Sequence, residues 1–131
     1  MTTLGLHHIN IRVTDELLAP VRDFYCAVVG LRQGPRPPFA SFGYWLYAGE
    51  NAVVHLSAAG PAEVCLTNAA TTLDHVAFSC VNFPAMIATL DAAGIRYEIA
   101  EVPSTGHKQL FFSDPVGNGV ELNFADEGAR G

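Results

Sequence analysis

Residues 114–124, DPVGNGVELNF, combine a tight turn with an alternating β-strand. Pro115 presets the backbone φ angle, and the glycines and asparagine around Gly117 tolerate the left-handed conformation that reverses a chain. Because successive strand side chains alternate, the apolar residues after Gly119 share one face, and Glu121 and Asn123 share the other. The sequence therefore predicts a carboxylate held on a rigid strand.

The composition favours a single domain, residues 1–131, that is long enough to bury a core. No apolar run approaches the roughly 20 residues that span a bilayer, and the N-terminal residues MTTLGLHHIN do not resemble a signal peptide. Seven Lys and Arg against thirteen Asp and Glu give a net charge of −6 without a basic run, so neither nucleic acid nor a membrane is an expected partner. The three cysteines form no CxxC pair, which favours reduced, buried thiols in a cytoplasmic protein.

Hydrophobic periodicity predicts two modules with the same order of elements, namely strand, helix and three strands. The first module spans about residues 4–57, with a strand at 4–13, a helix from Thr14 or Asp15 to Gly30, a short strand from Leu31, and a hairpin at 42–48 and 52–57. Pro20 is expected near the first turn of this helix. After a linker at about 58–72, the second module spans about 73–124, with a strand at 73–81, a helix from Phe83 to Gly94, and strands at 95–99, 109–113 and 119–124. The fold class is therefore α+β with two βαβββ modules.

The repeat aligns four residues with metal-binding side chains. His8 on the first strand corresponds to His75, and His55 on the last strand of its module corresponds to Glu121. The separations agree, because 55 − 8 = 47 and 121 − 75 = 46. All four lie on the more polar face of their strands.

Three neutral imidazoles and one carboxylate suit a borderline divalent ion such as Zn²⁺, Ni²⁺, Co²⁺, Mn²⁺ or Fe²⁺, whereas Ca²⁺ prefers more oxygen ligands. With four protein ligands, two of six coordination positions stay open for a substrate with adjacent oxygens. We therefore predict His8, His55, His75 and Glu121 as metal ligands.

Further side chains are expected to line a substrate pocket beside these ligands. Asn10, Arg12, Ser79 and Asn123 share faces with the four ligands, and Trp45 and Tyr47 offer an apolar wall. His107 and Lys108 lie on a loop before the penultimate strand, where they would receive an anionic substrate or, for His107, exchange a proton. His7 is expected to face away from His8.

Nearly the whole chain resembles the vicinal oxygen chelate superfamily. The resemblance rests on LHHINIRVTD, FYCAVVGL, GYWLYAGENAVVHL, LDHVAFSC and, most specifically, FFSDPVGNGVEL. It implies a cupped sheet around one metal ion, held by His8, His55, His75 and Glu121, and a cup formed within one chain or between two. Together with the acidic, half-apolar composition, it is compatible with a homodimer.

The resemblance implies three kinds of function. The leading one is a metal-dependent lyase or isomerase of the glyoxalase type that acts on a small molecule with vicinal oxygens, in which Glu121 would be the catalytic base. Glyoxalase I usually has a carboxylate at the place of His55, and this departure weakens the assignment. Extradiol dioxygenases and fosfomycin-modifying enzymes use two His and one Glu, which His8, His75 and Glu121 would supply while His55 lines the pocket. The third function is non-catalytic binding of a small molecule, as in bleomycin resistance proteins.

Overall fold

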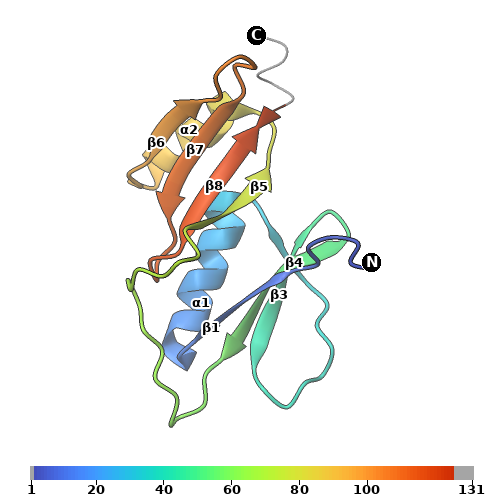
Figure 1. Cartoon of the computed structure of the whole chain (residues 1–131). Helices are drawn as coiled ribbons and strands as arrows, with labels where there is room; N and C mark the ends of the chain where they lie inside the picture. Colours follow the sequence, from blue (N-terminus) through green and yellow to red (C-terminus); the bar gives the residue numbers. More distant parts are fainter. Residues whose placement is uncertain (1, 126–131) are drawn as a thin grey trace. The chain divides into compact units, whose positions relative to one another are not determined.

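The computed structural model describes residues 2–125, which form two compact units that divide between Leu66 and Thr67 (Figure 1). This division falls inside the linker predicted at residues 58–72. A single domain for the two modules stays a prediction, and each unit is described by itself below. Residues beyond Ala125, which include most of the tail that the sequence predicts to fray, lie outside the described part of the chain.

The first unit is a four-stranded sheet with one helical run. Its elements are β1 (Ile9–Val13), α1 (Asp15–Phe24), η1 (Tyr25–Val29), β2 (Arg32–Gly34), β3 (Gly43–Ala48) and β4 (Asn51–Ala58). The strand order is β1-β4-β3-β2, in which β1 pairs with β4 in parallel and the other pairs are antiparallel. The helix α1 contacts β3 and β4 and covers the face that carries Leu46, Val54 and Leu56, all almost fully buried.

The second unit repeats this arrangement. Its elements are β5 (His75–Ser79), α2 (Phe83–Ala92), β6 (Glu98–Glu101), β7 (Lys108–Ser113) and β8 (Gly119–Phe124). The strand order is β5-β8-β7-β6, again with the first and last strands paired in parallel. Phe83 at the start of α2 packs edge-on against Phe124 of β8, with the ring centroids 5.3 Å apart. The two units confirm the predicted α+β fold of two βαβββ modules.

The first strand is shorter than the predicted residues 4–13. Pairing with β4 begins at Ile9, opposite Val54, and the preceding Leu4 and Leu6 are exposed. The strand predicted at residues 73–81 is likewise limited to His75–Ser79. Alternating hydrophobicity continues beyond the point at which a partner strand supplies hydrogen bonds, so the pattern overestimates both lengths.

The strand predicted at residues 95–99 instead begins at Glu98. The N–H of Ile95 donates to the carbonyl of Leu90 (3.0 Å), and the N–H of Gly94 donates to the carbonyl of Asp91 (3.1 Å). These bonds close the C-terminal end of α2, where Gly94 has a φ of 68°. The residues that follow the helix therefore complete its last turn before a strand begins.

The first helix differs from the prediction at Pro20. The helix α1 begins at Asp15, so Pro20 lies in its interior and not near its first turn. The helical run continues as the π-helix η1 and ends at Gly30, whose N–H donates to the carbonyl of Tyr25. Gly30 has a left-handed φ of 93°, as expected for the residue that terminates a helix.

The turn before β8 is organised by the carboxylate of Asp114, which is buried. Its Oδ1 accepts hydrogen bonds from the backbone N–H groups of Val116 (3.0 Å) and Asn118 (2.8 Å), and its Oδ2 accepts one from the Asn118 side chain (2.9 Å). Gly117 has a φ of 94°, within the left-handed region. This network confirms the predicted turn and sets the position at which β8 begins.

Two further predictions concern the cysteines and membranes. Cys26, Cys65 and Cys80 carry free thiols, but they are half-buried and not buried as predicted. In the described part of the chain, no helix combines the length and the apolar character needed to cross a bilayer.

Candidate functional site

His75 and Glu121 form a close pair on one face of the second sheet. The parallel register places Glu121 opposite Ala77, two residues after His75, so the two side chains are diagonal neighbours on the same face. The Nε2 atom of His75 lies 3.1 Å from Oε1 of Glu121. Two of the predicted metal ligands are therefore brought within contact distance by strand pairing alone.

The other ring nitrogen of His75 is held by a second carboxylate. Its Nδ1 lies 2.8 Å from Oδ2 of Asp74, the preceding residue. The hydrogen bond with Asp74 and the charge of Glu121 raise the pKa of His75 above its ordinary value. A carboxylate on Nδ1 orients the ring and directs Nε2 towards a ligand position, which is the usual arrangement around metal-binding histidines.

Glu121 is buried, with 6% of its surface exposed. Its Oε2 accepts hydrogen bonds from the side-chain amides of Asn123 (3.2 Å) and Gln109 (3.4 Å). These two donors hold the carboxylate in one orientation and leave Oε1 towards His75. A buried carboxylate with fixed donors is the kind of group that binds a metal ion or moves a proton.

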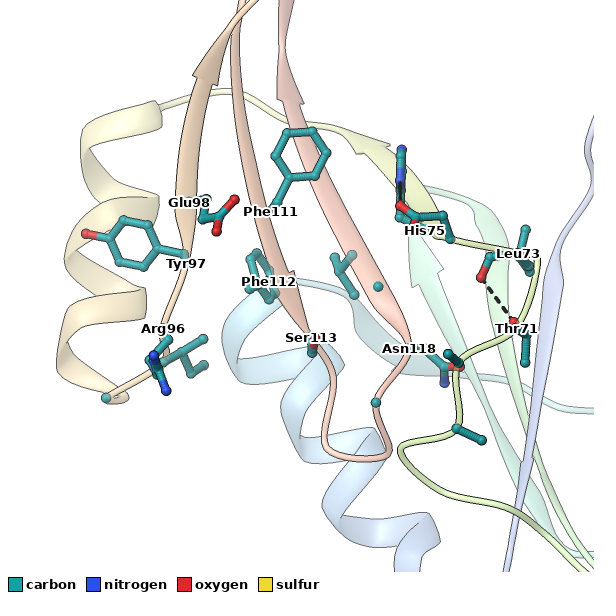
Figure 2. A pocket seen from close by; sticks show the side chains of 18 residues that line it. Thr71, Leu73, His75, Arg96, Tyr97, Glu98, Phe111, Phe112, Ser113 and Asn118 are labelled. Atoms are coloured by element: carbon teal, nitrogen blue, oxygen red, sulfur yellow. Dashed lines mark hydrogen bonds and ion pairs between the residues drawn. The ribbon is translucent and has the colours of Figure 1, made fainter.

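A cavity of about 860 Å³ in the second unit is lined by His75 but not by Glu121. Figure 2 shows His75, from β5, at one end of the cavity and Arg96 and Tyr97, which precede β6, at the other. Asp74, Glu98 and Phe111 also line it. The His75 ring makes an edge-on contact with Phe111, with the centroids 5.5 Å apart.

The first unit presents His8 and His55 in an equivalent relation. The register pairs His55 with Asn10, two residues after His8, as Glu121 pairs with the residue two after His75. The rings of His8 and His55 are stacked, with a centroid distance of 3.7 Å and an interplanar angle of 13°. The repeat predicted from the sequence is therefore reproduced in the strand register of both units.

His55 is more enclosed than His8, which is exposed. The His55 ring lies between His8 and Trp45, which stacks on its other face at 4.0 Å, and only 7% of the residue is exposed. Its Nε2 lies 3.1 Å from the carbonyl oxygen of Ala52, so Nδ1 is the nitrogen left for a ligand. Burial, and then the neighbouring His8, lower the pKa of His55, so this imidazole is neutral at pH 7.

His7 does not face away from His8 as the alternation predicts. The Nδ1 atoms of the two rings lie 2.8 Å apart. Because β1 begins only at Ile9, the period-two geometry of a strand does not apply to residues 7 and 8.

A cavity of about 500 Å³ opens beside His8 and His55 in the first unit. Asn10, Arg12 and Trp45, predicted as pocket residues, line it. Arg12 donates through Nε to Oε2 of Glu63 (2.6 Å) and also pairs through Nη2 with the other oxygen of that carboxylate. Glu63 therefore neutralises the charge of Arg12 within the unit.

The remaining predicted pocket residues lie outside the linings of these two cavities. Tyr47 donates its hydroxyl to the carbonyl of Pro35 (2.5 Å), and Ser79 pairs in register with Asn123, which contacts Glu121. The backbone N–H of His107 donates to Thr105, and the Lys108 ammonium lies 5.0 Å from the Phe83 ring centroid. These four residues and Asn123 line neither the cavity beside His75 nor the cavity beside His8.

The predicted ligands thus occur as two pairs, one in each unit. Among residues 2–125, no three or more His, Cys, Asp or Glu side chains are grouped so as to hold a metal ion. The union of the two pairs in one four-ligand site stays a prediction.

Comparison with known proteins assigns the family. The sequence pattern of the Glyoxalase/Bleomycin resistance protein/Dioxygenase superfamily matches residues 5–122. The chain belongs to this superfamily. No protein with a curated description matches it in sequence.

Solved structures of the superfamily share the fold. Lactoylglutathione lyase from Agrobacterium tumefaciens matches with 18% identity and a TM-score of 0.66, over 97% of this chain and 98% of its own. TnmS3, an antibiotic binding protein from Streptomyces sp. CB03234, matches with 20% identity and a TM-score of 0.67, over 95% and 98%. The fosfomycin resistance protein FosX from Listeria monocytogenes, in a mutant form complexed with Mn(II) and 1S,2S-dihydroxypropylphosphonic acid, matches with 15% identity and a TM-score of 0.72, over 98% of each chain. At these identities the likeness establishes the fold.

In this member of the superfamily, three side chains near the predicted ligands were not identified from the sequence. Asp74 directly precedes His75, so its position in the sequence could have identified it as a partner of this candidate ligand. Gln109 shares a face with Asn123 across the β7–β8 pair, but that signal needs the register. Arg36 lines the cavity of the first unit from a proline-rich loop, where periodicity carries no information about side-chain direction.

Proposed function

We propose that the protein is a metal-dependent lyase or isomerase of the glyoxalase type, acting on a small molecule with vicinal oxygens. The observation that carries this proposal is the pair of His75 and Glu121, 3.1 Å apart and oriented by Asp74 and by two amides. The pair of His8 and His55, at the equivalent register position of the other unit, supplies the remaining two ligands.

The donor set fits a borderline divalent ion. Three imidazoles, one of them directed by a carboxylate, and one buried carboxylate are the ligands expected for Zn²⁺, Ni²⁺, Co²⁺, Mn²⁺ or Fe²⁺. When bound, such an ion supplies Lewis acidity to adjacent substrate oxygens.

Glu121 is the group that moves the proton. Its carboxylate accepts a proton from one carbon of the substrate and returns it to the neighbouring carbon, so that it ends the cycle as it began. Asn123 and Gln109 keep Oε2 engaged throughout, which restricts the exchange to Oε1. The buried position excludes water that would otherwise compete for the proton.

The test uses the hemithioacetal of methylglyoxal and glutathione, with protein loaded in turn with each of the five metals. Glu121→Gln is expected to lower kcat by about 10²- to 10⁴-fold, the usual contribution of a general base. Glu101→Gln, an exposed carboxylate on β6, is the matched control and keeps full activity. Undiminished turnover by Glu121→Gln contradicts the role of Glu121, and a wild-type protein that is inactive with all five metals contradicts the glyoxalase assignment.

The proposal extends to the assembly and its location. We place the protein in the cytoplasm as a homodimer, in which the two pairs meet within one chain or across two. The free thiols of Cys26, Cys65 and Cys80 support a reducing compartment. Co-expression of His8→Ala and Glu121→Gln chains separates the two arrangements. If the site is shared across two chains, about a quarter of the activity returns, because about half of the dimers are mixed and each mixed dimer has one intact site of its two. A site within one chain restores none.

The surroundings of His55 support a second candidate, a dioxygenase-like Fe²⁺ enzyme that uses His8, His75 and Glu121. The His55 ring lies between His8 and Trp45, and its Nε2 is engaged by Ala52, so it resembles a pocket wall. In this case His55→Ala retains metal, as measured by elemental analysis, while His75→Ala loses it. Oxygen uptake with a catechol after anaerobic loading with Fe²⁺ distinguishes this activity from isomerisation.

The aromatic lining of the first cavity supports a third candidate, non-catalytic binding of a small molecule. Phe39 and Trp45 lie with their ring centroids 6.1 Å apart and both line this cavity, and TnmS3, which shares the fold, is an antibiotic binding protein. Stoichiometric metal in the purified protein argues against this candidate.

A further inference from the structure

The cavity of the first unit is bordered by the loop between β2 and β3. This loop contributes Arg36, Phe39 and Ser41 to the lining, and the sheet contributes Trp45 and His55. The loop therefore adds a positive charge to a cavity that the strands line with aromatic rings.

The backbone of this loop is held in place at several points. Pro35, Pro37 and Pro38 restrict their own φ angles, which lowers the conformational freedom of the segment. The hydroxyl of Tyr47 on β3 donates to the carbonyl of Pro35 (2.5 Å), and the N–H of Phe39 donates to the carbonyl of Pro37 (2.8 Å). Arg36 therefore extends from a constrained segment.

The guanidinium of Arg36 has only part of its hydrogen-bonding capacity in use. Nη1 donates to the carbonyl of Ser41 (2.9 Å) and Nη2 to its hydroxyl (3.4 Å). Nε is buried and has no hydrogen-bond partner. Since a guanidinium carries five N–H groups, the edge formed by Nε and Nη2 is left to donate. This edge matches the two oxygens of a carboxylate or phosphonate.

No carboxylate of the described residues balances the charge of Arg36. The described arginine ion pairs join Arg12 to Glu63 and Arg22 to Asp23. Arg36 instead lies over the Phe39 ring, at 4.9 Å from its centroid. A buried guanidinium nitrogen without an acceptor costs free energy, which a bound anion would recover.

The sheet leaves room for this guanidinium at Gly43. A Cβ atom at position 43 would lie 3.1 Å from Nη2 of Arg36 and 2.0 Å from the carbonyl oxygen of Leu56. The absence of a side chain at Gly43 lets the guanidinium lie close to β3, on the face that carries His55. The charge of Arg36 also contributes to the lowered pKa of His55, although burial and His8 contribute more.

We propose that Arg36 is the anion-binding residue of this cavity and that the substrate is a small organic anion, whose carboxylate or phosphonate-type group pairs with Nε and Nη2. The apolar body of the substrate would lie against Trp45 and Phe39. This inference rests on the proposed function in naming the ligand a substrate, because the cavity contains the predicted ligands His8 and His55.

The single tryptophan of the chain gives a direct measurement of binding. Trp45 lies in the cavity, stacked on His55, so its fluorescence reports occupancy. The full-length, chelator-treated protein is titrated with benzoate, phenylphosphonate and the neutral isostere benzamide. Both anions are expected to change the fluorescence in a saturable way, with dissociation constants about tenfold or more below that of benzamide.

Arg36 variants connect that preference to the guanidinium. Arg36→Gln is expected to weaken binding of both anions by about 10- to 100-fold and to leave benzamide unchanged. Arg36→Lys keeps the charge but loses the paired donors, so an intermediate affinity is expected. Arg32→Gln on the neighbouring β2 is the control, since Arg32 contacts Tyr47 and the carbonyl of Gly49 and does not line the cavity.

Three results would overturn the inference: equal binding of benzoate and benzamide, unchanged anion binding in Arg36→Gln, or no saturable response to either anion. Circular dichroism confirms that each variant is folded. Because the titrations contain no metal and no turnover, they are independent of the Glu121→Gln experiment. Anion binding without isomerase activity would reject the enzymatic proposal and leave the Arg36 site standing as that of a binding protein.

Discussion

The two units share one framework and differ in the charges that surround their candidate ligands. In both, the residue on the last strand lies diagonally across from a histidine two residues before its register partner. In the first unit burial lowers the pKa of His55, whereas in the second unit Asp74 raises the pKa of His75. The repeated strands thus determine where the donor atoms lie, and side chains that the repeat does not share shift the pKa of each histidine.

The difference extends to the two cavities. The cavity of the first unit is lined by Arg12 and Arg36 beside stacked rings, and that of the second by Asp74, Glu98 and Arg96 beside His75. The following variants test how far the likeness of the two frameworks extends.

The largest expected effect is the loss of equivalent core leucines. Leu56 follows His55 on β4 and Leu122 follows Glu121 on β8, and both are almost fully buried. Leu56→Ala and Leu122→Ala are each expected to lower the free energy of unfolding by about 2–5 kcal/mol, because each leaves a cavity. If the modules form one domain, both variants shift the same single transition in urea denaturation followed by circular dichroism.

Leu66→Ala is the control for this pair, since Leu66 is exposed and its loss is expected to change the free energy of unfolding by less than about 0.5 kcal/mol. Two separate urea transitions, of which Leu56→Ala moves one and Leu122→Ala the other, would contradict the prediction of a single domain.

The second expected effect distinguishes the starts of the two helices. Asn82 has a left-handed φ of 66°, and its side chain accepts a hydrogen bond from the N–H of Ala85 (3.2 Å). Thr14 occupies the same position before α1 without a side-chain cap. Asn82→Ala is expected to cost about 1–3 kcal/mol in unfolding free energy, and Thr14→Ala less than about 0.5 kcal/mol.

Asn82→Gly separates the two contributions to the destabilisation expected for Asn82→Ala, namely the left-handed backbone conformation and the lost side-chain cap. Glycine accepts the left-handed conformation but offers no cap, so a smaller loss than in Asn82→Ala is expected. Equal unfolding free energies for Asn82→Ala and Thr14→Ala would show that the two helix starts do not differ energetically.

The smallest expected effect concerns Glu63, which balances Arg12 in the first unit. The hydrogen bond from Arg12 lowers the pKa of Glu63 from its ordinary value of 4.5 to about 2. The stabilisation is therefore complete above about pH 4.5 and is lost as the pH falls towards 2. An NMR titration of the Glu63 carboxyl carbon should give this low pKa, and Arg12→Gln should return it towards 4.5. A pKa near 4.5 in the wild-type protein would contradict the pairing.

Much of the framework could be predicted because its signals are local. The β3–β4 hairpin, the turn at Asp114 and the end of α2 at Gly94 all depend on residues a few positions apart, and the structure confirms them. The lengths of β1 and β5 could not be predicted in this way, since a strand ends where its partner ends. Pro20 was misplaced because the start of α1 is decided by packing as well as by the preference of proline for a first turn.

The sequence by itself determined that two modules repeat one order of elements and that His8, His55, His75 and Glu121 occupy matching positions of the repeat. Period-two alternation and turn chemistry suffice for that. Only the tertiary structure decided that Glu121 is buried between Asn123 and Gln109, that His55 lies between His8 and Trp45, and that Arg36 reaches the cavity without a carboxylate partner among the described residues. Each of these depends on register and loop packing, which join residues far apart in the chain and leave no periodic trace in it.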